Sequence, residues 1–206
     1  METGSKNYFD EVAPAWDAMR QEFFPDHVRE QALRVAGVTA GQVAADIGAG
    51  TGFVTEALLR AGLSVIAVDQ STEMLETIAK KFPDADCRPG SAERLPIDDS
   101  SVDYVFANMY LHHVERPPEA IAEMARTLKP NGKLVITDLD HHDFEFLRVE
   151  QHDRWLGFER EDVRSWFSAA GLTDVSLDCV GDNCCADSTA GGARAEISIF
   201  IAQGTK

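Results

Sequence analysis

The sequence is poor in basic residues. Nineteen lysines and arginines stand against 35 aspartates and glutamates, which gives a formal net charge of −16, and no cluster of basic residues interrupts this excess. Proteins that bind nucleic acid replace counterions with basic side chains, and anionic membranes attract the same residues. We therefore expect neither nucleic acid nor a membrane surface as a partner.

Cysteines and long apolar runs are also scarce. Four cysteines in 206 residues are too few for a disulfide scaffold. No apolar run approaches the ~20 residues that span a membrane, and the N-terminus lacks the basic and apolar regions of a signal peptide. We expect residues 1–206 to form a single domain in the cytoplasm, with reduced thiols. The sequence carries no signal of the oligomeric state.

Strand-like and helix-like segments alternate almost to the end of the chain. This order predicts an α/β fold, a Rossmann-like doubly wound and mostly parallel sheet with helices on both faces. The predicted strands are residues 43–47, 64–68, 85–88, 102–107, 133–137, 175–180 and 196–202. The predicted helices are two within residues 8–35, broken near Pro25, and then residues 53–61, 72–82, 117–128 and 161–170.

The last two predicted strands are joined by residues 181–194, which hold no helical pattern. A parallel connection needs a crossover, usually a helix, whereas an antiparallel pair needs only a loop. The sequence therefore predicts a seven-stranded sheet that ends in an antiparallel hairpin.

The most informative segment is the first strand and the turn after it. The apolar run that ends in Asp46 is followed by Gly48, Ala49, Gly50 and Gly52. Glycine allows a sharp turn and a close approach of a ligand to the backbone, and open α/β sheets bind cofactors at the carboxyl ends of their strands. A dinucleotide site would require the spacing G-x-G-x-x-G, but Phe53 takes the place of the third glycine. The spacing therefore disfavours a nicotinamide cofactor.

Four motifs in this order resemble the class I S-adenosylmethionine-dependent methyltransferases. They are the glycine turn, Asp69 after the second strand, Ser91-Ala92-Glu93 before the fourth, and Leu111-His112-His113 after it. The similarity spans residues 8–202 and is greatest to the small-molecule, quinone-biosynthesis-like branch. Residues 143–157 and the end of the chain also resemble the methyltransferase halves of arsenic-repressor fusion proteins.

The resemblance implies S-adenosyl-L-methionine as the cofactor and a small molecule as the methyl acceptor. Asp46 would hold the amino group of the cofactor, Asp69 its ribose hydroxyls, and Met74 would lie against the adenine. The cofactor-binding residues that it implies are Tyr8, Trp16, Asp46, Gly48, Ala49, Gly50, Gly52, Asp69, Gln70, Met74, Ser91, Ala92, Glu93 and Asn108. Ser91 departs from the acid that the family often carries there, while the backbone N–H of Ala92 would still serve a ring nitrogen of the adenine.

Residues 7–36 resemble the helical lid of this family and carry Tyr8, Phe9 and Trp16. A lid matters because methyl transfer from a sulfonium ion needs alignment and the exclusion of water rather than a catalytic dyad. Packing of these aromatic side chains against the sheet remains an equal alternative.

Histidines follow the fourth and fifth predicted strands, at the edge where the acceptor is expected. His112, His113 and His141 are the catalytic candidates, since a histidine there could remove a proton from the acceptor. Structural roles for these histidines stay open. Asp138 and Asp140 could also face the acceptor.

Three cysteines near the C-terminus raise a sharper hypothesis. Cys179, Cys184 and Cys185 fall at the end of the sixth predicted strand and in the loop after it. Thiolates select soft metals and metalloids, so the three are candidate ligands of a metalloid such as arsenite, although their spacing matches no zinc motif.

The sequence leaves four functions to distinguish. Methyl transfer from S-adenosylmethionine to a small molecule is the leading hypothesis, and methylation of a thiol-bound metalloid is its variant. A non-catalytic sensor that binds the cofactor belongs to a different class, and a dehydrogenase is disfavoured by Phe53. The identity of the methylated atom does not follow from the sequence.

Overall fold

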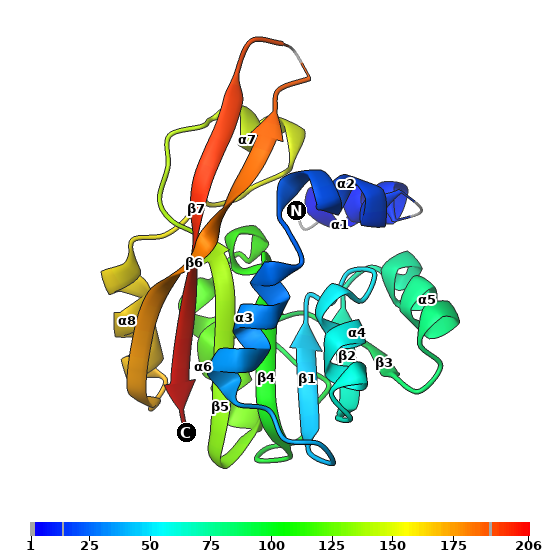
Figure 1. Ribbon diagram of the computed structural model, residues 1–206, viewed down its shortest axis with the longest axis vertical. Helices are drawn as coiled ribbons and strands as arrows, with labels where there is room; N and C mark the ends of the chain where they lie inside the picture. The colour runs from blue at the N-terminus through cyan, green and yellow to red at the C-terminus, as the bar shows by residue number, and fades with distance from the viewer. Residues whose placement is uncertain (1–2, 14, 190) are drawn as a thin grey trace.

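A seven-stranded sheet forms the centre of the computed structural model, which describes residues 3–13, 15–189 and 191–206. The strand order is β3-β2-β1-β4-β5-β7-β6 (Figure 1). The strands are β1 (Val43–Ile47), β2 (Ser64–Asp69), β3 (Asp86–Pro89), β4 (Val102–Asn108), β5 (Leu128–Leu139), β6 (Thr173–Asp187) and β7 (Arg194–Thr205). Strands β1 to β5 pair in parallel, and β7 runs antiparallel between β5 and β6. The predicted fold class is confirmed.

Helices cover both faces of the sheet. The helices are α1 (Thr3–Val12), α2 (Trp16–Phe23), α3 (His27–Ala36), α4 (Phe53–Arg60), α5 (Thr72–Lys81), α6 (Pro117–Thr127), α7 (Phe146–Glu150) and α8 (Arg160–Ala169), with a short 3₁₀ turn η1 (Leu111–His113). Ala44 and Phe106 belong to the core under α3 and α4, whereas Ala45 and Val105 belong to the core under α6 and α8. Successive strand residues point to opposite faces, so the central strands are apolar throughout because both faces are buried.

Local chemistry sets the helix boundaries that the sequence predicts. The hydroxyl of Ser71 accepts the backbone N–H of Met74 at 3.1 Å and caps α5. Pro117 begins α6, where its missing N–H is not needed. None of the helices in the described ranges has the length and apolar character required to traverse a lipid bilayer.

The N-terminal region holds three helices where the sequence predicts two. The predicted break near Pro25 is present, and a second break separates α1 from α2. Helices α1 and α2 lie across the carboxyl edge of the sheet, above the ends of β1 and β4, and α3 then runs down one face (Figure 1). The short amphipathic segments therefore cover the edge where the glycine turn lies.

The predicted loop over residues 181–194 is largely wrong. Strand β6 continues to Asp187, and β7 already begins at Arg194, so the two strands form a long hairpin that rises beyond the sheet edge (Figure 1). The pairing register shifts between Cys179 and Asn183, and such an irregularity bends a strand. The end of β6 is mostly polar because its outer side chains face solvent, so the sequence pattern did not predict a strand there. Cys184 and Cys185 therefore lie in a strand and not in a loop.

Candidate functional site

The glycine turn after β1 forms the floor of the site. Gly48 and Gly50 have φ angles of +68° and +54°, a left-handed conformation that glycine adopts without strain. The N–H groups of Gly48 and Ala49 both donate to the carbonyl of Val68 on the neighbouring strand, at 2.9 and 3.1 Å. This pairing fixes the turn against the end of β2.

Asp69 ends β2 and faces the same turn. Its carboxylate accepts the N–H of Gly50 at 2.9 Å through one oxygen and the N–H of Ser71 at 2.9 Å through the other. Burial raises the pKa of this carboxyl, and the backbone donors oppose the shift. The carboxylate is thus held in one orientation between the glycine turn and the start of α5, where a polar ligand can reach it.

A cleft with about 1050 Å³ of open space lies above the turn. Nine of the predicted cofactor-binding residues line it, which are Trp16, Gly48, Ala49, Gly50, Asp69, Gln70, Met74, Glu93 and Asn108. Trp16 comes from α2, and its indole Nε1 would lie 3.5 Å from a Cβ atom added at Gly50. The cleft thus runs between the turn and the helices that cover the sheet edge.

The other predicted cofactor residues do not line this cleft. Asp46 is buried beneath the turn, where it accepts the N–H and the hydroxyl of Thr55 at 2.8 and 2.7 Å. Burial raises its pKa to about 6. The hydroxyl of Tyr8 donates to the Gln151 side chain at 3.0 Å, which ties α1 to the segment after α7. Gly52 begins α4, and a Cβ atom there would meet Phe82 at 2.9 Å.

Tyr110 occupies the space between the glycine turn and the Ser91-Ala92 segment. A Cβ atom added at Gly48 would lie 2.2 Å from its ring, and its hydroxyl lies near the Gln70 side chain and the Ala92 backbone. Burial and the nearby Asp69 carboxylate raise the pKa of this phenol. Tyr110 therefore lies beside the Ala92 backbone that the resemblance assigns to the adenine, and Ala92 itself is fully buried. Nothing in the sequence singled out this tyrosine.

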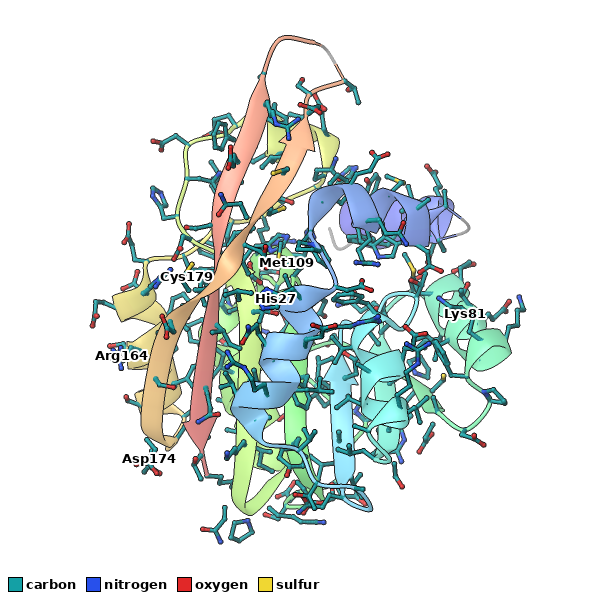
Figure 2. The ribbon with its side chains drawn as sticks, in the orientation of Figure 1. His27, Lys81, Met109, Arg164, Asp174 and Cys179 are labelled. Carbon is teal, nitrogen blue, oxygen red and sulfur yellow. The ribbon has the colours of Figure 1, made fainter. Side chains whose placement is uncertain are left out.

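A second cavity of about 500 Å³ adjoins the cleft. Met109 forms part of the wall between them, at the carboxyl end of β4 beneath the N-terminal helices (Figure 2). The residues that line both spaces are Phe9, Trp16, Phe24, Met109 and His113. The second cavity is otherwise apolar, with Phe23, Leu139, Leu147 and Ala186 in its walls. His112, Gln151 and Asp153 form its polar part.

Helix α2 is held over the site by a buried arginine. Arg20 donates to the carbonyl of Phe24 at 3.2 Å, and its guanidinium lies 4.1 Å from the ring centre of Phe53. A cation over an aromatic face is attracted to the ring. Phe53, which replaces the third glycine of a dinucleotide site, thus anchors the covering helix and lines the cleft.

The histidines that follow β4 have different surroundings. Nδ1 of His112 is 2.6 Å from Asp138, a fully buried carboxylate that also accepts the N–H of Leu111 at 2.8 Å. Burial alone would lower the pKa of His112, but the carboxylates of Asp138 and Asp153 raise it to about 9. Burial and the adjacent His112 lower the pKa of His113 well below its usual value. His113 is thus a neutral imidazole in the wall between the two spaces.

His141 does not join this group. Its side chain is half exposed, it lies 3.6 Å from Glu159, and it lines neither of the two spaces. The chain after β5 turns the side chain of His141 toward the solvent, and its catalytic role stays a prediction. Asp140 is likewise engaged elsewhere, in an ion pair with Arg160 at 2.7 Å.

The three candidate metalloid ligands are not brought together as one set. Cys184 is buried and lines the second cavity, whereas its neighbour Cys185 points to the other face of the strand. Cys179 is exposed where β6 bends (Figure 2). Burial raises the pKa of the Cys184 thiol to about 12, so this thiol is protonated near neutral pH. Alternation along a strand, which the predicted loop concealed, explains the difference.

Comparison with known proteins finds a similarity that begins in β1 and ends in β5. Residues 45–136 match the family model described as the methyltransferase domain. This segment of the chain is therefore similar to methyltransferase domains. Over 139 residues it is 38% identical to a demethylmenaquinone methyltransferase of Renibacterium salmoninarum, an alignment that covers 66% of this chain and 59% of that protein. The chain thus spans about three fifths of the length of this curated relative.

Solved structures agree on the fold. A SAM-dependent methyltransferase from Thermotoga maritima has a TM-score of 0.73 at 20% identity. The match covers 98% of this chain and 100% of the Thermotoga chain. A phosphoethanolamine N-methyltransferase of Haemonchus contortus, solved with S-adenosyl-L-methionine, has a TM-score of 0.70 at 18% identity, covering 86% of this chain and 52% of that one. The solved structures support the predicted fold, and the similarity in sequence agrees with the predicted enzyme class, an S-adenosylmethionine-dependent methyltransferase.

Proposed function

We propose that this protein transfers a methyl group from S-adenosylmethionine to a small, largely apolar acceptor. The observation that carries the proposal is the wall shared by the two spaces, which contains Trp16, Met109 and His113. Because the two spaces share these lining residues, a ligand in the cleft and a ligand in the second cavity would lie next to each other. Such an arrangement suits the direct transfer of a group between two bound molecules.

The cleft fits the chemistry of the proposed cofactor. The left-handed turn at Gly48 and Gly50 brings backbone close to a ligand. The oriented carboxylate of Asp69 suits ribose hydroxyls at the end of a second parallel strand. Glu93 and Asn108 supply further polar groups, and Met74 an apolar contact. When bound, S-adenosylmethionine supplies an activated methyl group on a sulfonium ion.

The chain itself contributes alignment and the exclusion of water. Positioning of two reactants can lower a barrier by about 7–11 kcal/mol, and the aromatic residues of α1 and α2 shield the shared wall from solvent. We therefore propose that residues 7–36 act as a lid. Tyr8 serves this lid by anchoring α1 to Gln151 and not by contact with the cofactor.

The second cavity favours an acceptor with an aromatic ring and a polar substituent. Leu139, Leu147 and Ala186 offer apolar contact, and His112, His113 and Asp153 gather polar groups in one part of the cavity. A quinol or phenol has this division between an apolar ring and a polar edge. The relative named demethylmenaquinone methyltransferase agrees with such an acceptor class.

The metalloid variant has no specific observation in its favour. The cysteines do not form one ligand set, and the buried Cys184 is a protonated thiol. The sensor alternative differs from an enzyme by the absence of turnover, so the same assay separates the two.

The test is methyl transfer from labelled S-adenosylmethionine to a panel of quinols, phenols, amines, thiols and arsenite. We expect transfer to a quinol or phenol. The variant Ala186→Leu narrows only the second cavity and should raise the KM of the acceptor while the affinity for the cofactor is unchanged. Cofactor binding without transfer to any acceptor would contradict the proposal and support the sensor.

A further inference from the structure

Three side chains in the second cavity bring their donor atoms close together. Nε2 of His112 lies 3.7 Å from Oδ1 of Asp153, and Nδ1 of His113 lies 3.9 Å from the same oxygen and 3.4 Å from the carbonyl oxygen of His152. One ligand atom from each residue falls within 4.8 Å of the others. Within the parts of the chain that the structure describes, this is the one group of three or more such side chains.

These contacts are too long for hydrogen bonds. Side-chain hydrogen bonds require about 2.7–3.2 Å between nitrogen and oxygen, yet the Asp153 side chain is only 4% exposed. In the parts of the chain that the structure describes, the ion-pair contacts of its carboxylate are with these two histidines. A buried carboxylate needs a positive partner, and a metal ion among the three atoms would supply that charge in place of a protonated His112.

The surroundings of His112 match those of a metal ligand. Its Nδ1 faces the buried Asp138 at 2.6 Å, and Asp138 is itself fixed by the backbone N–H groups of Leu111 and Leu139, each at 2.8 Å. Metal-binding histidines almost always donate their other ring nitrogen to a carboxylate or carbonyl in this way, which sets the tautomer. With a proton kept on Nδ1, Nε2 is the nitrogen nearest Asp153, and a metal ion there would take the place of the proton on Nε2.

We infer that His112, His113 and Asp153 bind a divalent transition-metal ion, Zn²⁺ or a chemically similar ion of the first row. Two imidazoles and one carboxylate are a known donor set for such ions, and three protein ligands leave a coordination position open. The open position faces the second cavity, because all three residues line it. There it takes an oxygen of the acceptor, a role that rests on the proposed function.

Metal binding by the chain of residues 1–206 tests the inference without any assay of turnover. After dialysis against a chelator, the protein is titrated with Co²⁺, followed by its visible absorption, and with Zn²⁺, followed by calorimetry. We expect one ion per chain. The isosteric variant Asp153→Asn should weaken binding at least 100-fold, and Asp138→Asn by 10- to 100-fold through loss of the histidine orientation.

His27→Gln is the matched control. His27 begins α3, pairs with Asp182 and lines neither of the two spaces, so the variant should bind the metal as the wild type does. Circular dichroism of each variant verifies that it is folded, and cofactor binding is measured on the same samples. Absence of stoichiometric binding by the wild type, or equal binding by a folded Asp153→Asn variant, would overturn the inference. Intact cofactor binding in that case would leave the proposed function standing.

Discussion

The edge of the sheet proposed to bind the cofactor (the cofactor edge) and the second cavity, proposed to bind the acceptor (the acceptor cavity), are built from the chain in opposite ways. The edge around Gly48 and Asp69 comes mainly from one continuous segment, a strand, a turn, a helix and a second strand. The acceptor cavity draws on α1, α2, the end of β4, the segment after α7 and the hairpin strand β6. A local segment can be predicted from its spacing, whereas a cavity assembled from distant segments depends on the complete fold.

Two glycines with similar backbone angles test how rigid each region is. Gly157 lies beside the acceptor region with φ +67°, and its Cβ atom would lie 2.2 Å from the backbone oxygen of Asp140. At Gly48, with φ +68°, the added atom would lie 2.2 Å from Cγ and 2.9 Å from Cβ of Tyr110, so rotation of the ring alone does not clear it. Gly157→Ala and Gly48→Ala should therefore each reduce the free energy of unfolding by about 4 kcal/mol. Urea denaturation measures both, and a loss below about 1 kcal/mol in either variant would contradict the clash at that glycine.

The buried acid of the cofactor edge predicts a pH dependence. The pKa of Asp46 rises from 3.8 to about 6 on folding because of burial. The folded state thus keeps this proton to higher pH than the unfolded state, so the stability contributed by this group is full below pH 3.8 and declines as the pH rises through 6. Across that window wild type should lose about 3 kcal/mol relative to Asp46→Asn. Denaturant unfolding at pH 4 and pH 7 tests this, and parallel pH profiles would refute it.

Two aromatic residues of the covering helices should differ in effect. Trp16 lines both spaces, while Tyr8 lines neither and bonds to Gln151 in the wall of the second cavity. Trp16→Ala should weaken S-adenosylmethionine binding about tenfold, or about 1.4 kcal/mol, and raise the KM of the acceptor. Tyr8→Phe is the matched control and should leave cofactor affinity unchanged in a calorimetric titration. A loss of cofactor affinity in Tyr8→Phe would mean that the tyrosine contacts the cofactor directly.

The smallest expected effect concerns Tyr110. Its ring covers Gly48 and its hydroxyl lies near the Ala92 backbone, so it must move before a ligand takes that place. A protein whose binding-competent state is only partly populated shows reduced affinity. Tyr110→Ala should therefore tighten cofactor binding by about two- to fivefold, as measured by calorimetry. Weaker binding would show that the ring supports the ligand rather than competing with it.

The sequence predicted the fold and most of the cofactor edge because these features are local. The alternation of strand-like and helix-like segments predicted the succession of elements along the chain, and the glycine spacing predicted the position of the turn. Nine of the predicted cofactor residues line the cleft, while Asp46 fell beneath it because Thr55 engages its carboxylate. An acid that supports a turn and an acid that faces a ligand look alike in a sequence.

The acceptor cavity could not be predicted in the same way. Asp153 lies in a segment without clear periodicity, and it meets His112 and His113 only through the path of the chain after β5. The polar outer face of β6 concealed a strand, and with it the opposite directions of Cys184 and Cys185. Side chains from distant segments have no common spacing in the sequence, so their contact cannot be predicted from a motif.

The most direct test of the account is a calorimetric titration of S-adenosylmethionine into wild type, Asp69→Ala and the control Glu76→Ala. Asp69 faces the cleft, whereas Glu76 is exposed on α5. The account predicts binding of one molecule by the wild type and by Glu76→Ala. It predicts at least 100-fold weaker binding by Asp69→Ala, a loss of about 3 kcal/mol. No binding by the wild type, or equal binding by Asp69→Ala, would contradict it.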